Sequence, residues 1–151
     1  MTLTEIPSDA ELVERFPYAS IDHDNKALYR GWLEKSLRMN RCDDCQRFHH
    51  PPKPVCPSCW CSSLVPSEVS GRGTIHLAMF LHQGPPAPGV DYAKAPHPVV
   101  TVELEEQEGL RFTSTVAGCA PEEVRIGALV ELDWVDRLGA PFPVFRLVEK
   151  S

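Results

Sequence analysis

The chain has 151 residues, a mass of 16.9 kDa and a net charge of −6, with 42% apolar and 24% charged residues. That length suits one compact domain, or such a domain with a small module attached, and excludes a multidomain machine. The composition is that of a folded globular protein rather than of a disordered chain. Because an acidic surface repels polyphosphates and anionic lipids, we expect neither nucleic acid nor a membrane as partner.

The sequence shows no pattern for crossing or entering a membrane. No apolar run reaches the roughly 18–20 residues that span a bilayer. The first residues lack the basic and then apolar pattern of a secretory signal. We therefore expect a cytoplasmic protein.

The first zone, residues 1–40, is the part with helical signals. Ser8 and Glu11 have the spacing of a capping box, so a short helix is predicted over residues 9–16. A longer amphipathic helix is predicted over residues 24–39, and its apolar face is expected to pack on its own domain. The apolar residues at helical spacing are Leu28, Trp32, Leu33 and Leu37.

Two cysteine pairs in the second zone, residues 41–64, carry the strongest signal in the chain. They are Cys42 with Cys45 and Cys56 with Cys59. Each pair has Cys-x2-Cys spacing, so each can aim two thiolates at one point. Four thiolates meet the tetrahedral coordination of Zn²⁺ and leave no open position. We therefore expect a structural, non-catalytic zinc in a rubredoxin-like ribbon.

Alternatives for these cysteines stay open. Iron takes the same ligand set, and disulfides would form in an oxidising compartment, although a cytoplasmic chain favours metal. His49, His50 or Cys61 could replace a ligand, but with two complete pairs we expect them outside the site. The remaining cysteine, Cys119, is expected to be a small buried apolar residue.

The third zone, residues 65–151, alternates in the manner of short β-strands. Strands are predicted over residues 74–82, 99–105, 110–116, 128–135 and 144–148. A single helical turn is predicted within residues 121–126. Five strands with a helical insert after the third are typical of an OB-fold barrel, although an SH3-like barrel or an open sandwich has similar strand content. The predicted fold is mainly β: N-terminal helices over 1–40, a zinc ribbon over 41–64 and an OB-fold barrel over 65–151.

Sequence motifs of catalysis are missing. The chain has no GxSxG, Walker A, HExxH or dinucleotide GxGxxG motif, so no residue is predicted to be catalytic. Residues 61–151 hold seven basic and twelve acidic residues, which argues against the single-strand binding that OB barrels often perform. A small anionic ligand fits the few cations better than a polymer does.

The order of these features resembles one known family. An amphipathic helix precedes the first cysteine pair, and the spacer His-Pro-Pro-Lys-Pro-Val at residues 50–55 leads to Cys-Pro-x-Cys. Ser-Gly-Arg-Gly-Thr-Ile follows at residues 70–75, and Pro-Glu-Glu-Val-Arg-Ile-Gly occupies residues 121–127. Together they resemble the DUF35 family of zinc-ribbon OB-fold proteins, over about residues 26–147.

The resemblance implies an accessory subunit that performs no chemistry alone. Members of the family associate with thiolase-like enzymes, among them aldolases and acyltransferases, or with hydratases acting on CoA thioesters, and some act in steroid side-chain degradation. Ribbon and barrel are expected to help bind CoA and to shape the entrance to the partner's active site. The chain departs from many relatives at Gln46, where they carry glycine, and at Lys53, where they carry arginine.

Four cations are candidates for contact with the phosphates of acyl-CoA: Arg47, Lys53, Arg72 and Lys94. The long loop over residues 83–98 is expected to cover a ligand or a partner, because compact domains rarely keep such loops without use. The predicted function is an accessory subunit of a thiolase-like enzyme. The alternatives are a subunit of an acyl-CoA hydratase complex and a nucleic-acid-binding or scaffold module.

Overall fold

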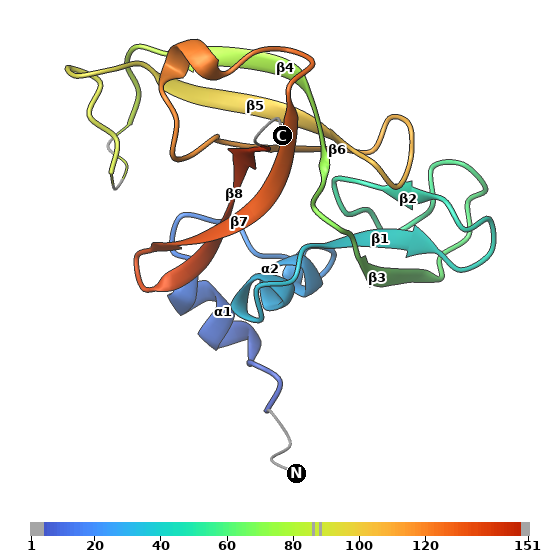
Figure 1. The fold of residues 1–151 in the computed structure, drawn as a ribbon. Helices are drawn as coiled ribbons and strands as arrows, with labels where there is room; N and C mark the ends of the chain where they lie inside the picture. The colour runs from blue at the N-terminus through green and yellow to red at the C-terminus, as the bar shows by residue number, and fades with distance from the viewer. Residues whose placement is uncertain (1–4, 86, 88, 149–151) are drawn as a thin grey trace. The chain divides into compact units, whose positions relative to one another are not determined.

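The computed structural model describes residues 5–85, 87 and 89–148 (Figure 1). The chain forms two compact units. The ribbon unit holds the chain up to Glu68 together with Asp136–Pro141, and the barrel unit holds Val69–Val135 with the residues from Phe142 onward. Each unit has its own buried core and is described by itself.

Helix α1 (Asp9–Arg15) confirms the first predicted helix to within one residue. The Ser8 side chain accepts a hydrogen bond from the backbone N–H of Glu11 at 3.2 Å, which satisfies one unpaired donor of the first turn. Phe16, directly after the helix, is fully buried, and its ring lies edge-on to Trp32 with 5.8 Å between centroids. This burial holds α1 in place, because so short a helix is marginal in water.

The second predicted helix is wrong in length, since α2 (Lys26–Leu33) ends well before Met39. Lys35 adopts a left-handed backbone with φ 55°, and the N–H of Ser36 donates to the carbonyl of Gly31 at 2.9 Å, so the chain turns out of the helix. Gly31 permits this turn, because a Cβ there would lie 2.6 Å from the Ser36 carbonyl oxygen. The end of α2 has no sequence signal, because lysine rather than glycine occupies the left-handed position.

The residues after this turn form a strand. Strand β1 (Arg38–Cys42) lies in the middle of a three-stranded antiparallel sheet between β2 (Phe48–His49) and β3 (Leu64–Glu68). Leu37 and Met39, each 1% exposed, follow the period of two that a strand imposes. The spacing that suggested a longer helix therefore joined apolar residues from two different elements.

All five predicted barrel strands are present. They are β4 (Gly73–Leu81), β5 (His97–Leu104), β6 (Arg111–Ser114), β7 (Leu129–Arg137) and β8 (Ala140–Leu147). A single 3₁₀ turn, η1 (Pro121–Glu123), lies between β6 and β7, where a helical turn is predicted. Leu138 and Gly139 join β7 to β8 with positive φ at both residues, which is the hairpin geometry that matches strand twist.

The strands are hydrogen bonded in the order β6–β5–β4–β7–β8. A parallel bridge joins Val116, after β6, to Phe145 of β8. The Phe145 N–H donates to the carbonyl of Thr115 at 2.9 Å, and the Ala117 N–H donates to the carbonyl of Phe145 at 2.8 Å. These bonds connect the two edge strands, so the sheet forms a nearly closed barrel. The predicted OB-fold is confirmed, with its helical turn after the third strand.

The barrel core takes inward-facing residues from every strand. They are Ile75, Val100, Val102, Leu104, Phe112, Val130, Val144 and Phe145, all 6% exposed or less. In β5 the buried residues alternate with more exposed ones, as expected where one sheet face is covered. The alternation that predicts these strands is therefore the one that builds the core.

Gly73 begins β4 at a place with no room for a side chain. A Cβ there would overlap the carbonyl oxygen of Glu103 and lie 2.7 Å from the side chain of Val102. We expect Gly73→Ala to push β4 away from β5 and to lower the free energy of unfolding by about 1–3 kcal/mol. Gly109→Ala is the control, because a Cβ there meets nothing within 4 Å and only strains a positive φ. Chemical denaturation that shows the larger loss at Gly109 would contradict this reading.

The loop between β4 and β5 contains neither helix nor strand in its described part. The Asp91 carboxylate accepts a hydrogen bond from the N–H of Ala93 at 3.0 Å and closes a turn. Pro86 and Pro88 of the predicted loop lie outside the described residues. Within the described part of the chain, neither helix is long and apolar enough to cross a bilayer.

Candidate metal centre and cation sites

Two turns of the ribbon unit hold the paired cysteines, and both use the same backbone hydrogen bonds. In the first turn the Gln46 N–H donates to the carbonyl of Cys42, and the Cys42 N–H donates to the carbonyl of Arg47, both at 2.9 Å. The second turn repeats these bonds at 2.9 and 2.8 Å. Its corresponding residues are Trp60, Cys56 and Cys61. We call the two turns the first and second knuckle.

The residue after each cysteine pair adopts a left-handed backbone. The φ angle is 64° at Gln46 and 68° at Trp60. This conformation favours glycine, because other side chains crowd the backbone there. Gln46 departs from the glycine of many relatives, whereas nothing local marks Trp60 as left-handed. Aligning the two knuckles with each other places Trp60 opposite Gln46 and is the signal that identifies it.

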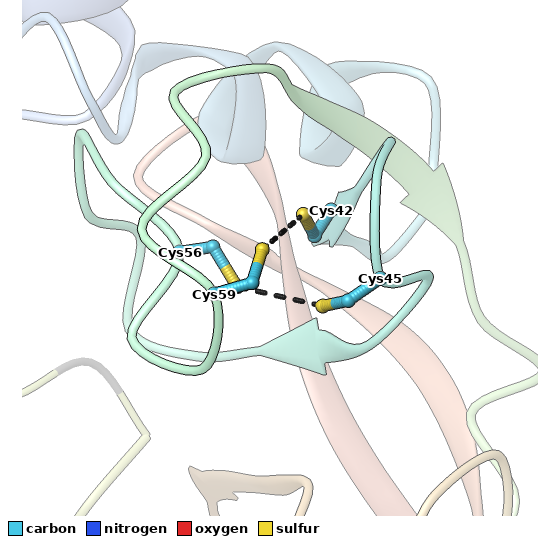
Figure 2. Close-up of side chains that lie close together, drawn as sticks. All are labelled: Cys42, Cys45, Cys56 and Cys59. Atoms are coloured by element: carbon cyan, nitrogen blue, oxygen red, sulfur yellow. Dashed lines mark hydrogen bonds between the residues drawn. The ribbon is translucent and has the colours of Figure 1, made fainter.

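The knuckles bring four sulfur atoms to one point, as Figure 2 shows. All four Sγ atoms lie within 4.8 Å of one another, with 3.5 Å between Cys42 and Cys59 and 3.7 Å between Cys45 and Cys56. Zn–S bonds of about 2.3 Å in a tetrahedron separate the sulfurs by about 3.8 Å. The four thiolates therefore fit a zinc ion, and such a site leaves no coordination position for a substrate.

The same surroundings act differently on the pKa values of two of the clustered cysteines. Burial works to raise the pKa of Cys56, but the N–H groups of Cys59 and Ser58, together with the neighbouring sulfur atoms, outweigh it and lower that pKa to about 6. The N–H of Cys61 favours the thiolate of Cys59, but burial and the crowded sulfur atoms raise its pKa to about 12. A divalent cation would remove this crowding penalty, because it binds the thiolate form.

The other cysteines and the paired histidines lie outside this cluster in the described structure. Burial, and then His49, lower the pKa of His50 to about 4, so its ring is neutral. The Cys61 sulfur accepts a hydrogen bond from the N–H of Ser63 at 3.4 Å. The prediction of a buried Cys119 is wrong: it is half-buried, because it lies in the loop before η1 rather than in a strand.

Two of the predicted CoA-binding cations lie in the barrel unit and are ion-paired. The Arg72 guanidinium lies 2.8 Å from the Glu105 carboxylate, and this contact raises the pKa of Arg72 and holds that of Glu105 below its usual value. The Lys94 ammonium lies 3.7 Å from Asp91. A phosphate would have to displace these carboxylates, which makes both cations weaker candidates.

A pocket of about 410 Å³ in the barrel unit lies beside Arg72. Glu103, Glu105 and Glu108 contribute to its lining, and Leu129 forms part of an apolar wall. Three carboxylates against one guanidinium repel a phosphate rather than attract it. The pocket is therefore a poor site for the phosphate-bearing end of CoA.

The other two predicted cations, Arg47 and Lys53, lie in the ribbon unit and are exposed. Neither forms an ion pair with any residue in the described part of the chain. Arg47 belongs to the first knuckle, and Lys53 precedes the second. Burial, and then the Lys53 ammonium, lower the pKa of His49, which places that cation near β2. Of the four candidate cations, these two could therefore bind a phosphate without first breaking an ion pair.

Two family models match consecutive parts of the chain. The model described as "ChsH2, rubredoxin-like zinc ribbon domain" matches residues 31–65. The model described as "ChsH2, C-terminal OB-fold domain" matches residues 67–135. The first match includes both knuckles, and the second includes β4, β5 and β6.

Two relatives are identical to the chain at about a third of the aligned residues. A "Probable enoyl-CoA hydratase alpha subunit" from Thermomonospora curvata is 32% identical over 146 residues, which cover 93% of this chain and 44% of that protein. The chain thus spans less than half the length of that relative. A "DUF35 domain-containing scaffold protein" from Methanocaldococcus jannaschii is 33% identical over 113 residues, which cover 71% of this chain and 76% of that protein.

A solved structure shares both the fold and the sequence. A chain of "Ltp2-ChsH2(DUF35) aldolase" is 32% identical and superposes with a TM-score of 0.75, covering 85% of this chain and 98% of that chain. The matched models, the relatives and this structure agree with the motifs of the ribbon and the barrel. The chain therefore belongs to the DUF35 family of zinc-ribbon OB-fold proteins.

Proposed function

We propose that this chain is the non-catalytic accessory subunit of a thiolase-like enzyme, an aldolase or an acyltransferase. The observation that carries the proposal is the likeness to a chain of an aldolase, over 98% of that chain's length. The name of the Methanocaldococcus relative, a scaffold protein, supports a role in assembly. The family resemblance implies steroid side-chain degradation as one setting, and the missing signal and membrane patterns suggest the cytoplasm; we propose both as the first to test.

In this proposal each part of the chain has a separate task. The helical segment 1–40 and the ribbon 41–64 form one recognition element, and the barrel 65–151 forms the other. Zn²⁺ held by the four clustered cysteines would keep the knuckles folded and, with all four positions filled by thiolates, would act on no substrate. The chemistry would belong to the partner subunit, since the sequence has no GxSxG, Walker A, HExxH or dinucleotide GxGxxG motif.

We further propose that the accessory subunit binds the CoA part of an acyl-CoA thioester. Arg47 and Lys53 are exposed cations without a carboxylate partner in the described structure, so they are the first candidates for its phosphates. Arg72 and Lys94 are second candidates, because each would first have to leave its own carboxylate. The acidic pocket beside Arg72 supports this order.

A second candidate function is a subunit of an acyl-CoA hydratase complex. The likeness to the hydratase alpha subunit from Thermomonospora curvata covers 93% of this chain, which favours it. The match leaves more than half of that relative uncovered. The hydratase activity of the whole relative can therefore belong to the part that this chain does not match. The two candidates share CoA thioesters as substrates and differ in the partner.

Affinity purification from the native host tests the proposal. The tagged, zinc-loaded chain is expected to retain a thiolase-like protein in near-equal amount, identified by mass spectrometry, and the pair is expected to act on a CoA thioester. Tag alone is the control for binding to the resin. Recovery of a hydratase would favour the second candidate. Recovery of nucleic-acid machinery would overturn both and favour the nucleic-acid-binding module.

A further inference from the structure

Trp60 combines two unfavourable features in one residue. Its side chain is 84% exposed, so a large apolar surface remains in water. Its backbone is left-handed with φ 68°, a conformation that is an outlier for a bulky residue. No other residue of the described chain makes a ring contact or hydrogen bond with the indole. Packing within the ribbon unit therefore gives no reason for tryptophan at this position.

The first knuckle shows that the turn itself does not need an aromatic residue. Gln46 holds the same left-handed position with the same backbone hydrogen bonds. Its side-chain amide donates to the carbonyl of Asp43 at 2.7 Å and so closes its own knuckle. The Trp60 side chain makes no corresponding hydrogen bond within the described residues. An outlier of this kind, unexplained by the fold, points to a role in binding.

We propose that the indole of Trp60 is the stacking platform for the adenine base of CoA, an inference that rests on the CoA binding proposed above. Stacking on a nucleobase requires a flat aromatic face that is open to solvent, and tryptophan provides the largest such face. The exposure of Trp60 meets this requirement without rearrangement.

The position of Trp60 within the ribbon suits the phosphates as well as the base. The Cys45 and Cys59 sulfur atoms lie within 4.8 Å of each other. Arg47 follows Cys45 by two residues and Trp60 follows Cys59 directly, so both residues belong to the turns that carry the sulfur cluster. The adenosine 3′,5′-bisphosphate end of CoA carries its phosphates on the same ribose as its base. Such a ligand needs a cation close to the stacking face.

Calorimetric titration of the zinc-loaded full chain with adenosine 3′,5′-bisphosphate and with CoA tests the inference. Trp60→Gly is expected to weaken binding of both by about 5- to 140-fold, the range for the loss of one base stack. The same variant is expected to raise the melting temperature by about 2–4 °C, because glycine tolerates the positive φ. A residue kept for packing would give the opposite change in melting temperature.

Gln46→Gly is the matched control, because it relieves the same backbone strain in the first knuckle. It is expected to raise the melting temperature similarly and to leave both affinities unchanged. If the native chain binds CoA and Trp60→Gly binds it equally, the stacking role is wrong and the proposed CoA binding stands. If the native chain binds neither ligand, both are overturned. Binding of a dT10 oligonucleotide in their place, lost in Trp60→Gly, also overturns the inference.

Discussion

Replacing Cys42 by serine is expected to release the metal and to unfold the two knuckles. Cys42 is fully buried, and its sulfur lies 3.5 Å from that of Cys59. Structural zinc contributes about 10–16 kcal/mol of apparent binding free energy in zinc-finger peptides, so the loss of one of four thiolates should cost about 3 kcal/mol or more. Metal analysis should find less than one zinc per chain, and hydrogen exchange should become fast in β1 and β2.

Cys119→Ser is the matched control for this experiment. Cys119 is a half-buried cysteine of the barrel unit and lies outside the sulfur cluster. Its replacement is expected to leave zinc content and melting unchanged, while Cys59→Ser should reproduce the effect of Cys42→Ser. A full complement of metal and native melting in both ligand variants would refute the four-cysteine site. Iron instead of zinc in the native protein would keep the site and change its metal.

Replacing Phe145 by alanine is expected to be the most damaging core substitution in the barrel unit. Its side chain is fully buried, and its ring lies 6.2 Å from that of Phe112, between centroids. The same residue forms the backbone bridge that closes the barrel between β8 and the end of β6. A cavity at this position should lower the free energy of unfolding by about 3–5 kcal/mol. Denaturant titration measures the loss.

Phe80→Ala provides the comparison within the same unit. Phe80 lies in β4 and is 36% exposed, so its replacement removes less apolar burial and leaves no closed cavity. We expect the loss there to be under about 1.5 kcal/mol. Both variants should keep one zinc per chain, because the four clustered cysteines belong to the ribbon unit. Equal losses at the two positions would show that the Phe145 side chain is not a central part of the barrel core.

Elements with local signals were predicted well. The Ser8 cap marks the start of α1, and the cysteine spacing marks both knuckles, because each signal depends on residues a few positions apart. The barrel strands were predicted because their residues alternate between the core and solvent. The backbone geometry at Gln46 and Trp60 has no such local signal, since neither position holds the glycine that usually marks it.

The errors arose where one element meets the next. The end of α2 was missed because Lys35 takes a left-handed conformation without a glycine, and the apolar residues beyond it continued a helical spacing by coincidence. The half-burial of Cys119 was missed because burial in a loop depends on neighbours distant in sequence. Neither the spacing of apolar residues nor the composition of the chain shows which distant residues pack against a loop.

The sequence alone determined the metal ligands to be expected, the order of ribbon and barrel, and the family, because each depends on residue identity and spacing along the chain. Only the tertiary structure decided that the barrel closes through Val116 and Phe145. That bridge joins the end of β6 to β8, and β7 lies between these two strands along the chain. It also decided which cations are free. Arg72, directly before β4, meets Glu105, directly after β5, because Gly73 and Leu104 are paired, whereas Arg47 meets no such carboxylate among the described residues. Ion pairing between distant residues follows from strand register, which a linear pattern does not contain.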